Sequence, residues 1–588
     1  MPQLYPRTLL ALAAALATTA CQSTTDTTSI ETAATADQAF ERYKARFVDS
    51  LWYYNPTWAS SQGYHRYDSM LVLPTAGRRQ LEAKTNARWQ RELAGFKVGE
   101  LSVNNQTDYR LMVNELRSEQ WYADTLRQWE WNPALYNVSE PVADILNGRY
   151  QPLDHRLRSI SMKISRAPEY YEAAETNLKN PTKEHLTLGI NQNRGGLDVF
   201  GKALEDSIAR SGLSAREKEE FRGRIATTRL AIENYISFLD KQLRPRATRS
   251  FRIGPELFRQ KFAYDIQSAY SADAVYQKAL RHKQELLQDM AVRATRLWPK
   301  YFGQQAMPAD TLTRIRQVIG KLTQTHATPA GFVAAVRQQI PALVKFVDDK
   351  KLLTQDPSKP LVVRETPLYM RGSGASVSAP GPYDKSANTY YNVEPLTGTP
   401  AAQAESYLRE YNQYTLQILN IHEAIPGHYT QLVYSNQSPS IIKAVLGNGA
   451  MVEGWAVYAE RMMLENGYGG GSDEIWLMWD KWNMRVTLNT ILDHQVQAGA
   501  ITEPQAVQML QREGFQEEAE ARNKWLRATL SQVQLSSYFT GYTEIYDLRE
   551  ELKRQQGKSF DLKAFHEQFL SYGSAPVKYI RQMMLQKQ

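Results

Sequence analysis

Cysteine is almost absent from this sequence, because Cys21 is the single cysteine among 588 residues. A chain with one cysteine has no internal disulfide bond, and the chain beyond Cys21 has no thiol chemistry available to it. Long blocks of like charge are absent too, and the net charge of +8 is spread over 70 basic and 62 acidic residues. This distribution favours solubility, and no basic stripe interleaved with aromatic residues points to nucleic-acid binding.

The overall composition is that of a soluble globular protein, with 42% hydrophobic and 22% charged residues. There is no internal repeat and no glycine-rich phosphate loop. A chain of this length can bury a large hydrophobic core.

The N-terminus has the pattern of a bacterial lipoprotein signal. Arg7 precedes an apolar run at residues 9–17, which is too short to span a bilayer and ends in small residues before Cys21. We expect a signal peptide over residues 1–20 and a lipid anchor on Cys21. The alternative is an ordinary signal peptide that is cut near this point, with Cys21 incidental.

The residues after Cys21 predict where the protein is anchored. Gln22 stands where an aspartate would favour retention in the inner membrane, so we expect an outer-membrane anchor with the protein facing the periplasm. Residues 21–37 are rich in Thr, Ser and Ala and are expected to form a flexible tether. Residues 38–588 are expected to form a single, mainly α-helical domain that could have two lobes.

Helical periodicity dominates this domain, with clear apolar stripes at 77–95, 212–243, 267–297 and 330–349. The pattern changes at 354–400, where prolines and glycines cluster around strand-like runs at 361–364 and 389–393. We expect a small β-sheet there, beside the active-site cleft, with an edge that could hold an extended substrate. An irregular linker between two helical halves is the alternative.

The strongest functional signal is the run Ile-His-Glu-Ala-Ile-Pro-Gly-His at residues 421–428. His422 and His428 offer two nitrogen ligands for zinc, and Glu423 offers a carboxylate that can take a proton from a metal-activated water. Zincins place their two histidines four residues apart on one helix face, whereas these are six apart, about 240° around an ideal helix. Pro426 is therefore expected to break or distort the helix so that both rings can meet.

A helix expected from about residue 401 would carry His422 on its buried face. A second helical segment at 451–463 places Glu453 and Glu460 on one apolar stripe, seven residues apart. Buried carboxylates are costly unless they are paired or bind metal, so Glu453 is expected to be the third zinc ligand. Glu460 is a reserve ligand or a partner that orients a ligand histidine. A solvated helix edge is the alternative for both.

These segments resemble the bacterial family called "domain of unknown function 885", whose members are regarded as candidate zinc peptidases. The resemblance rests on residues 422–428 and 453–460 and, more weakly, on residues 63–68, 537–541 and 548–549. More distantly, the order of the histidine motif, the glutamate and the late tyrosine along the chain is similar to that of helical oligopeptidases of the angiotensin-converting-enzyme type. Those proteins have the four-residue histidine spacing. The resemblance implies that Tyr538 stabilises the oxyanion, with Tyr542 as the second choice.

The sequence thus predicts a zinc peptidase with one Zn²⁺ per chain, held by His422, His428 and Glu453, and a peptide substrate. Glu423 would accept the proton of the attacking water and pass it to the leaving amine. Arg485 and His494, on an expected helix at about 473–497, could bind a substrate carboxylate or be structural. Two alternatives are a non-catalytic binding lipoprotein and a hydrolase that acts on a non-peptide amide.

Overall fold

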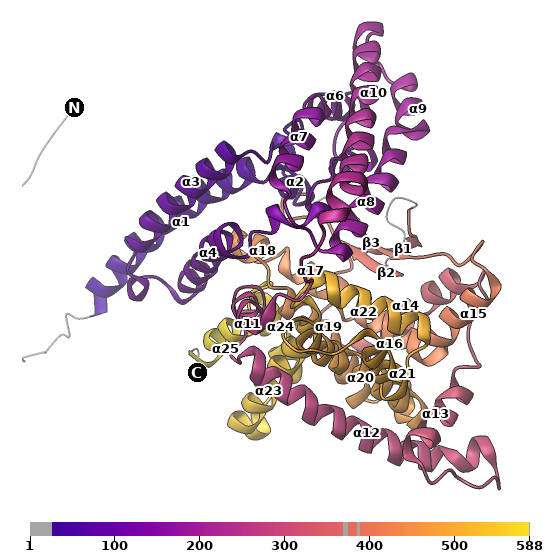
Figure 1. Ribbon diagram of the computed structural model, residues 1–588. Helices are drawn as coiled ribbons and strands as arrows, with labels where there is room; N and C mark the ends of the chain where they lie inside the picture. The colour runs from indigo at the N-terminus through magenta and orange to yellow at the C-terminus, as the bar shows by residue number, and fades with distance from the viewer. Residues whose placement is uncertain (1–25, 368–373, 385–387, 587–588) are drawn as a thin grey trace, which may run out of the picture.

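The computed structural model describes residues 26–367, 374–384 and 388–586 (Figure 1). The predicted signal peptide and the predicted lipidation site, Cys21, lie outside these residues. The prediction of a mainly α-helical protein with a small sheet is confirmed. None of the described helices combines the length and the apolarity needed to cross a membrane.

The N-terminal helices form an elongated arm (Figure 1). They are α1 (Asp26–Tyr54), α2 (Pro56–Ser61), α3 (Ala76–Ala94) and α4 (Val103–Trp121). Helix α1 begins inside the segment 21–37 that we expected to be a flexible tether, because alanine favours helix and the segment holds no proline or glycine. Phe40, Tyr43, Trp52 and Trp89 form much of the buried core of this arm.

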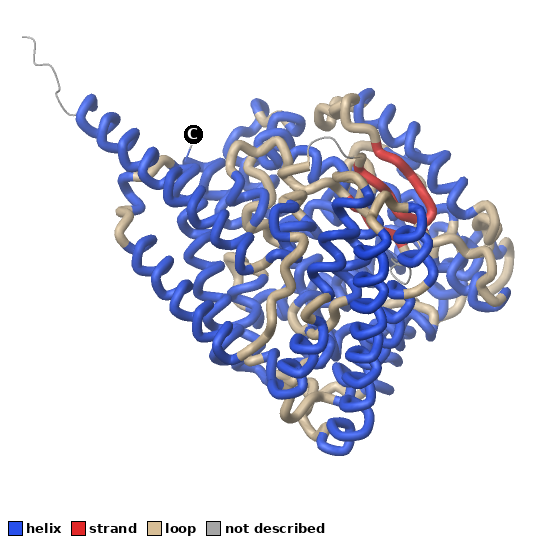
Figure 2. The backbone as a smooth tube through the Cα atoms, turned by 90° about the horizontal axis from the view of Figure 1, so that it is seen from above, coloured by secondary structure: helices blue, strands red, loops and turns tan. Residues whose placement is uncertain are grey.

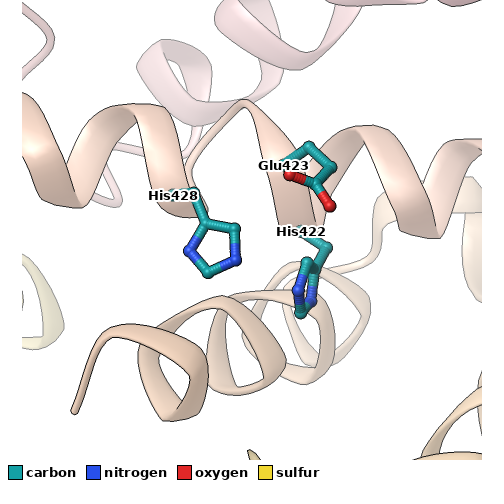
Figure 3. A group of neighbouring side chains, drawn as sticks. All are labelled: His422, Glu423 and His428. Atoms are coloured by element: carbon teal, nitrogen blue, oxygen red, sulfur yellow. The ribbon is translucent and has the colours of Figure 1, made fainter. Parts of the chain in front are cut away.

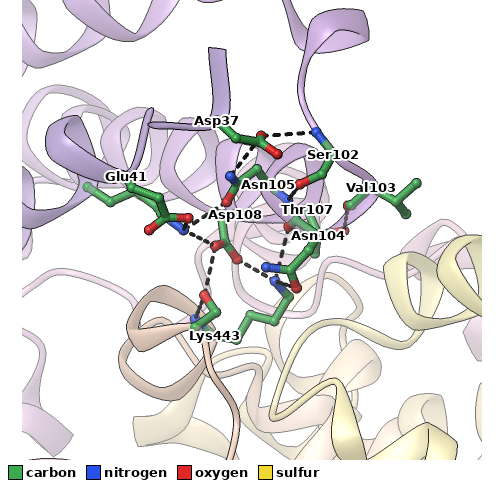
Figure 4. Close-up of polar contacts among 11 residues, drawn as sticks. Asp37, Glu41, Ser102, Val103, Asn104, Asn105, Thr107, Asp108 and Lys443 are labelled. Carbon is green, nitrogen blue, oxygen red and sulfur yellow. Dashed lines mark hydrogen bonds and ion pairs between the residues drawn. The ribbon is translucent and has the colours of Figure 1, made fainter. Parts of the chain in front are cut away.

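A buried polar network fixes the arm to the rest of the molecule (Figure 4). Asp108 of α4 is fully buried and accepts hydrogen bonds from Lys44 of α1 at 2.7 Å and from Ser440 at 2.7 Å. It also pairs with Lys443 at 2.5 Å, in the short helix α18 (Ile441–Val445). One carboxylate therefore joins segments that are more than 300 residues apart in the sequence.

A second group of helices surrounds its own apolar cluster, which includes Ile160, Leu186, Ile232 and Tyr235. These helices are α5 (Ser139–Asn147), α6 (Leu153–Ile164), α7 (Ala167–Asn177), α8 (Lys183–Gly196), α9 (Lys202–Arg210) and α10 (Ala215–Ser237). The helix expected at 212–243 is α10, continued by a π-helical turn at Phe238–Leu243.

The largest buried cluster draws its residues from Phe258 to Met584, and the candidate site lies among the same helices. Its helices are α11 (Gly254–Asp265), α12 (Ala272–Phe302), α13 (Thr311–Leu322), α14 (Phe332–Asp349), α15 (Ala401–Glu410), α16 (Gln413–Glu423), α17 (His428–Ser435), α19 (Gly449–Glu465), α20 (Asp473–Gln497), α21 (Glu503–Arg512), α22 (Glu518–Ser531), α23 (Ser537–Gln556), α24 (Leu562–Ser571) and α25 (Val577–Gln586). Helices α19 and α20 are buried along most of their length. Helix α19 is apolar on most of its surface, whereas α20 also buries charged side chains such as Asp480 and Lys481.

The helix expected from about residue 401 is in fact two helices, α15 and α16. The side chain of Asn412 accepts hydrogen bonds from the backbone N–H groups of Tyr414 and Thr415 and so caps a new helix. The apolar spacing continues across the break, which is why periodicity alone did not reveal it.

A three-stranded sheet lies at one side of the molecule (Figure 2). Strand β3 (Thr389–Val393) is central and pairs in parallel with β1 (Leu361–Glu365) and antiparallel with β2 (Ala375–Ser378). Both expected strands are confirmed, and the linker alternative is wrong. Strand β2 was not predicted, because Ala-Ser-Val-Ser has neither the length nor the β-branched content of a typical strand.

Candidate metal centre

The chain breaks its helix between the two histidines of the 421–428 motif (Figure 3). Helix α16 ends at Glu423 and α17 begins at His428, with a cis peptide bond between Ile425 and Pro426. A Cβ on Gly427 would overlap the carbonyl groups of Ile421 and His422, so the tight return requires glycine. The expected break is confirmed, and the rings of His422 and His428 lie with centroids 4.7 Å apart.

Two carboxylates flank this pair of imidazoles. Glu423 follows His422 directly, and one ligand atom from each of His422, Glu423 and His428 lies within 4.8 Å of the others. Glu453 approaches from α19, with its Oε2 atom 3.4 Å from His428 Nε2 and 3.7 Å from His422 Nε2. One oxygen thus faces both ring nitrogens, and the structure brings together the four residues predicted at the centre of the site.

Glu460, two helical turns after Glu453, contacts the opposite side of one ring. His422 Nδ1 donates a hydrogen bond to Glu460 Oε1 at 2.7 Å, and the indole of Trp482 donates to the same oxygen at 3.0 Å. A neutral imidazole that donates through Nδ1 keeps its Nε2 lone pair free. Glu460 therefore orients His422 so that this lone pair points toward Glu453.

The electrostatics of the cluster are dominated by burial and by its carboxylates. Burial alone would lower the pKa of His422, but its contacts with Glu453 and Glu460 outweigh that effect and raise the pKa to about 10. Burial would raise the pKa of Glu453, yet the two imidazoles hold it well below its ordinary value. Burial raises the pKa of Glu460. The cluster thus attracts positive charge.

The donor set fits a divalent cation. Three carboxylates face two imidazoles that are neutral in their metal-binding form, so the residues carry an excess of negative charge. Glu453 Oε2 and His428 Nδ1 are buried and have no hydrogen-bond partner within the described part of the chain. Two imidazole nitrogens and one carboxylate oxygen are a common ligand set for catalytic zinc.

Tyr538 reaches the cluster because two helices approach unusually closely. A Cβ on Gly454 of α19 would overlap the backbone of Gly541 in α23, and one on Gly541 would overlap the carbonyl of Ala450. This contact brings the first turn of α23 next to Glu453, whose charge contributes to the raised pKa of Tyr538, after burial. Arg527 donates a hydrogen bond to the Tyr538 hydroxyl at 3.0 Å.

A cavity of about 1030 Å³ opens onto the cluster. Its walls include the metal-binding candidates, Tyr538, strand β2 and the inner face of α22, from which Lys524 and Arg527 enter the cavity. Lys524 and Arg527 were not predicted. In the sequence, α22 looks like a charged surface helix, so no local signal marks these two.

Three other predicted residues have different surroundings. Arg485 lines the cavity but pairs with Glu520 at 2.7 Å and Glu410 at 3.8 Å. The structure does not bring the remaining two to the cavity: Tyr542 accepts a hydrogen bond from Arg461 at 2.7 Å, and His494 stacks on Tyr276 with ring centroids 4.1 Å apart.

Comparison with known proteins gives a family and two similar structures. The family model described as "Bacterial protein of unknown function (DUF885)" matches residues 56–584. A candidate lipoprotein of unknown function from Shewanella oneidensis is 52% identical, with a TM-score of 0.85 over 93% of this chain and 99% of that one. A candidate lipoprotein from Colwellia psychrerythraea is 15% identical, with a TM-score of 0.77 over 94% and 100%, and shows a shared fold. None of the curated proteins compared with the chain matches it.

Proposed function

Because the chain belongs to the DUF885 family of bacterial proteins of unknown function, its own site must indicate its activity, and we propose that it is a zinc-dependent peptidase. Its substrates would be oligopeptides outside the cytoplasm. The observation that carries this proposal is the convergence of His422 Nε2, His428 Nε2 and Glu453 Oε2 at the edge of a large cavity.

These three residues would hold the zinc ion, and Glu460 would orient His422 from behind. Structural zinc sites are normally closed by four protein ligands, whereas catalytic sites combine three with an open position. A three-ligand set beside a cavity therefore favours catalysis over a structural metal. Zinc bound there would supply Lewis acidity, which polarises a carbonyl and makes a water molecule acidic enough to lose a proton near neutral pH.

Glu423 is the proposed proton acceptor. Its carboxylate lies beside both imidazoles, and within the described part of the chain no side chain forms a hydrogen bond or ion pair with it. It is thus free to take the proton of the attacking water and deliver it to the leaving nitrogen. The Tyr538 hydroxyl, oriented by Arg527, would donate a hydrogen bond to the oxyanion.

The sheet supplies a place for the peptide backbone. Strand β2 lines the cavity, and on the side away from β3 it pairs with no other described strand. An extended peptide that added to this edge would lie across the cavity that is lined by the proposed zinc ligands.

We further propose that the protein is an envelope lipoprotein, lipidated on Cys21 and anchored in the outer membrane. The short apolar run before Cys21 supports a lipoprotein signal, and the two similar structures are described as candidate lipoproteins. Labelling with a lipid precursor should mark the wild-type chain and not Cys21→Ala. Membrane fractionation then tests the outer-membrane assignment.

The test of the peptidase proposal combines metal analysis with digestion of a peptide library. We expect about one zinc per mature chain and cleavage of peptides by the wild-type protein. Glu423→Gln should keep the zinc and lose activity by a factor on the order of 100 or more, because the proton acceptor is gone while the ligands remain. His422→Ala and His428→Ala should lose the zinc.

Each contrary result has its own meaning. Full zinc occupancy in both histidine variants would show that the ligands are elsewhere. A Glu423→Gln protein without zinc would make Glu423 a ligand. Zinc without peptide cleavage would favour a binding lipoprotein, or a hydrolase of non-peptide amides if such a substrate is turned over.

A further inference from the structure

One wall of the cavity, formed by α20 and α22, is strongly charged. Arg485 of α20 lines it with Glu520, Lys524 and Arg527 of α22. Lys481 and Glu410 form an ion pair next to Arg485. The carboxylate of Glu410 accepts a hydrogen bond from Lys481 at 2.7 Å, and that of Glu520 pairs with Arg485 at 2.7 Å. Each carboxylate is thus already paired with a cation, and neither Lys524 nor Arg527 has a carboxylate at hydrogen-bonding distance among the described residues.

Lys524 is buried, with 4% of its side chain exposed, although it lines the cavity. Its nearest anionic neighbour is Glu520, at 3.7 Å, which is too far for a hydrogen bond and is the same oxygen that Arg485 binds. Among the described residues, none accepts a hydrogen bond from the ammonium group. A buried ammonium without an acceptor is costly, so a ligand that supplies one would be bound favourably.

Arg527 lies one helical turn beyond Lys524 and also borders the cavity. Its guanidinium donates to Gln534 at 2.7 Å and to Tyr538 at 3.0 Å, and no carboxylate lies within ion-pair distance of it in the described ranges. The two cations therefore form a pocket of positive charge that adjoins the proposed oxyanion donor.

We propose that Lys524 and Arg527 bind a carboxylate of the peptide substrate while the scissile bond lies at the proposed zinc site. This inference rests on the proposed peptidase function. The carboxylate could come from the C-terminus of the peptide or from an acidic side chain, since both offer the same two oxygens. The first source would make the protein an enzyme that removes residues from the C-terminus.

The surroundings of Lys524 support this assignment. Burial and the nearby Arg485 lower the pKa of Lys524 well below its ordinary value, with Glu520 opposing them. A carboxylate that entered the pocket would favour the charged ammonium and gain a charge-assisted hydrogen bond. Lys481 provides the comparison, because it is equally buried but already bonded to Glu410.

Calorimetric titration tests the pocket without requiring turnover. The probes are N-acetyl-dialanine and its C-terminal amide, together with the amides of N-acetyl-alanyl-glutamate and N-acetyl-alanyl-glutamine. We expect the wild-type protein to bind the free acid, or the glutamate peptide, at least about tenfold more tightly than its neutral counterpart, as a charge-assisted hydrogen bond predicts. A difference between the free acid and its amide would identify the C-terminus as the source of the carboxylate. A difference between the glutamate and glutamine peptides would identify an acidic side chain.

Lys524→Met, which keeps the length of the side chain, should bring that ratio close to one. Arg522→Met is the matched control, because it removes a cation from the same helix that pairs outside the cavity with Glu518. It should keep the wild-type ratio. Thermal unfolding of both variants checks that each remains folded.

Three results would overturn the proposal. The first is a wild-type protein that binds no probe or does not distinguish acid from amide. The second is a Lys524→Met protein with an unchanged ratio. The third is a preference for the acid that survives Lys524→Met but disappears in His428→Ala. That result would show that the carboxylate binds at the proposed zinc site. Because binding is measured directly, a wild-type protein that cleaves no peptide would refute the peptidase proposal alone.

Discussion

The two histidines of the cluster differ in what holds their second ring nitrogen. His422 Nδ1 donates to Glu460, whereas the buried Nδ1 of His428 has no hydrogen-bond partner in the described part of the chain. His428 is instead fixed by its place in the first turn of α17 and by the close return at Gly427. The orientation of the two proposed ligands thus depends on a side chain in one case and on the backbone in the other.

Glu460→Gln should therefore weaken zinc binding without abolishing it. Glutamine can still accept the hydrogen bond from His422, but it loses the negative charge that makes the ring a stronger ligand. We expect an affinity lower by about 10- to 100-fold, measured by competition with a chelator. Glu465→Gln, which alters an outward carboxylate on the same helix, is the control. Equal affinities in both variants would contradict this role.

Tyr538→Phe should lower kcat by about 10²- to 10³-fold, because it removes one proposed oxyanion donor, and should change KM little. Tyr542→Phe provides a matched control one turn away. Its hydroxyl bonds to Arg461 outside the main cavity, so peptide cleavage should stay near the wild-type rate. A larger loss in Tyr542→Phe than in Tyr538→Phe would exchange the two assignments.

The sequence predicted the centre of the site because His422, Glu423 and His428 are close together in it, and Glu453 lies on a recognisable stripe. Trp482, Lys524 and Arg527 could not be found in this way. Each is one of many residues of its type on a helix, and only the packing of α22 against α20, and of α20 against α16 and α19, brings them to the cavity.

Two glycines, Gly454 and Gly541, allow the close approach of helices α19 and α23. Gly541→Ala would place a methyl group against the Ala450 carbonyl. We expect a loss of about 1–3 kcal/mol in the free energy of unfolding, as for other overpacked sites. Activity should fall as well, because Tyr538 moves away from Glu453. Urea unfolding and peptide cleavage measure the two effects.

Gly223→Ala is the control for that substitution. Gly223 lies inside α10, and a Cβ there would meet no atom within 4 Å. Alanine is the better helix former by about 1 kcal/mol, so this variant should be as stable as the wild type or more stable. If both alanine variants had the same stability, close packing at Gly541 would be excluded.

Helix α24 is attached to α19 through a neutral histidine. His566 Nδ1 donates to the Leu352 carbonyl at 2.8 Å, and its Nε2 accepts from the Tyr458 hydroxyl at 2.8 Å. Burial lowers the pKa of His566 from 6.5 to about 4. Between these two values the unfolded chain binds more protons than the folded one, so the free energy of unfolding falls as the pH drops through this range.

His566→Gln should remove part of that dependence on pH. The shift corresponds to a contribution of about 3 kcal/mol that is lost between pH 6.5 and pH 4. Urea unfolding at several pH values measures the slope in both proteins. Some slope should remain in the variant, since burial also lowers the pKa of His185 to about 4. An unchanged slope would contradict the assignment.

Helices were easier to predict from the sequence than their interruptions. The expected segments at 77–95, 330–349 and 473–497 agree closely with α3, α14 and α20, and the N-capping residues Thr75 and Ser472 mark where α3 and α20 begin. The break between α15 and α16 depends on one capping asparagine. Strand β2 is stabilised by its pairing with β3, which no local pattern encodes.

Over the molecule as a whole, the attachment of the N-terminal arm depends on buried charge. Asp108→Asn would leave Lys443 buried without a carboxylate, and Lys44 would keep only its ion pair with Glu41. Breaking a buried pair in this way costs about 3–5 kcal/mol, so we expect a clear fall in the unfolding midpoint. Asp206→Asn, in an exposed pair with Lys202, should change stability by less than about 0.5 kcal/mol. Similar losses in both variants would contradict this account.

This attachment could not be predicted from the sequence. Asp108 and Lys443 are separated by 335 residues, and neither lies in a motif that marks a partner. The prediction of one domain over residues 38–588 likewise did not reveal the separate apolar clusters of the arm and of the helices α5–α10.

The break between α16 and α17 has a thermodynamic consequence. Each histidine belongs to its own helix, and α17 is also held by Gln431 and Ser435, which bond to Ser574 at 2.9 and 3.0 Å. A ligand that changed the angle between the two helices would therefore change the affinity for a metal ion. By reciprocity, the metal would change the affinity for that ligand by the same factor. Histidines four residues apart on one rigid helix would lack this coupling.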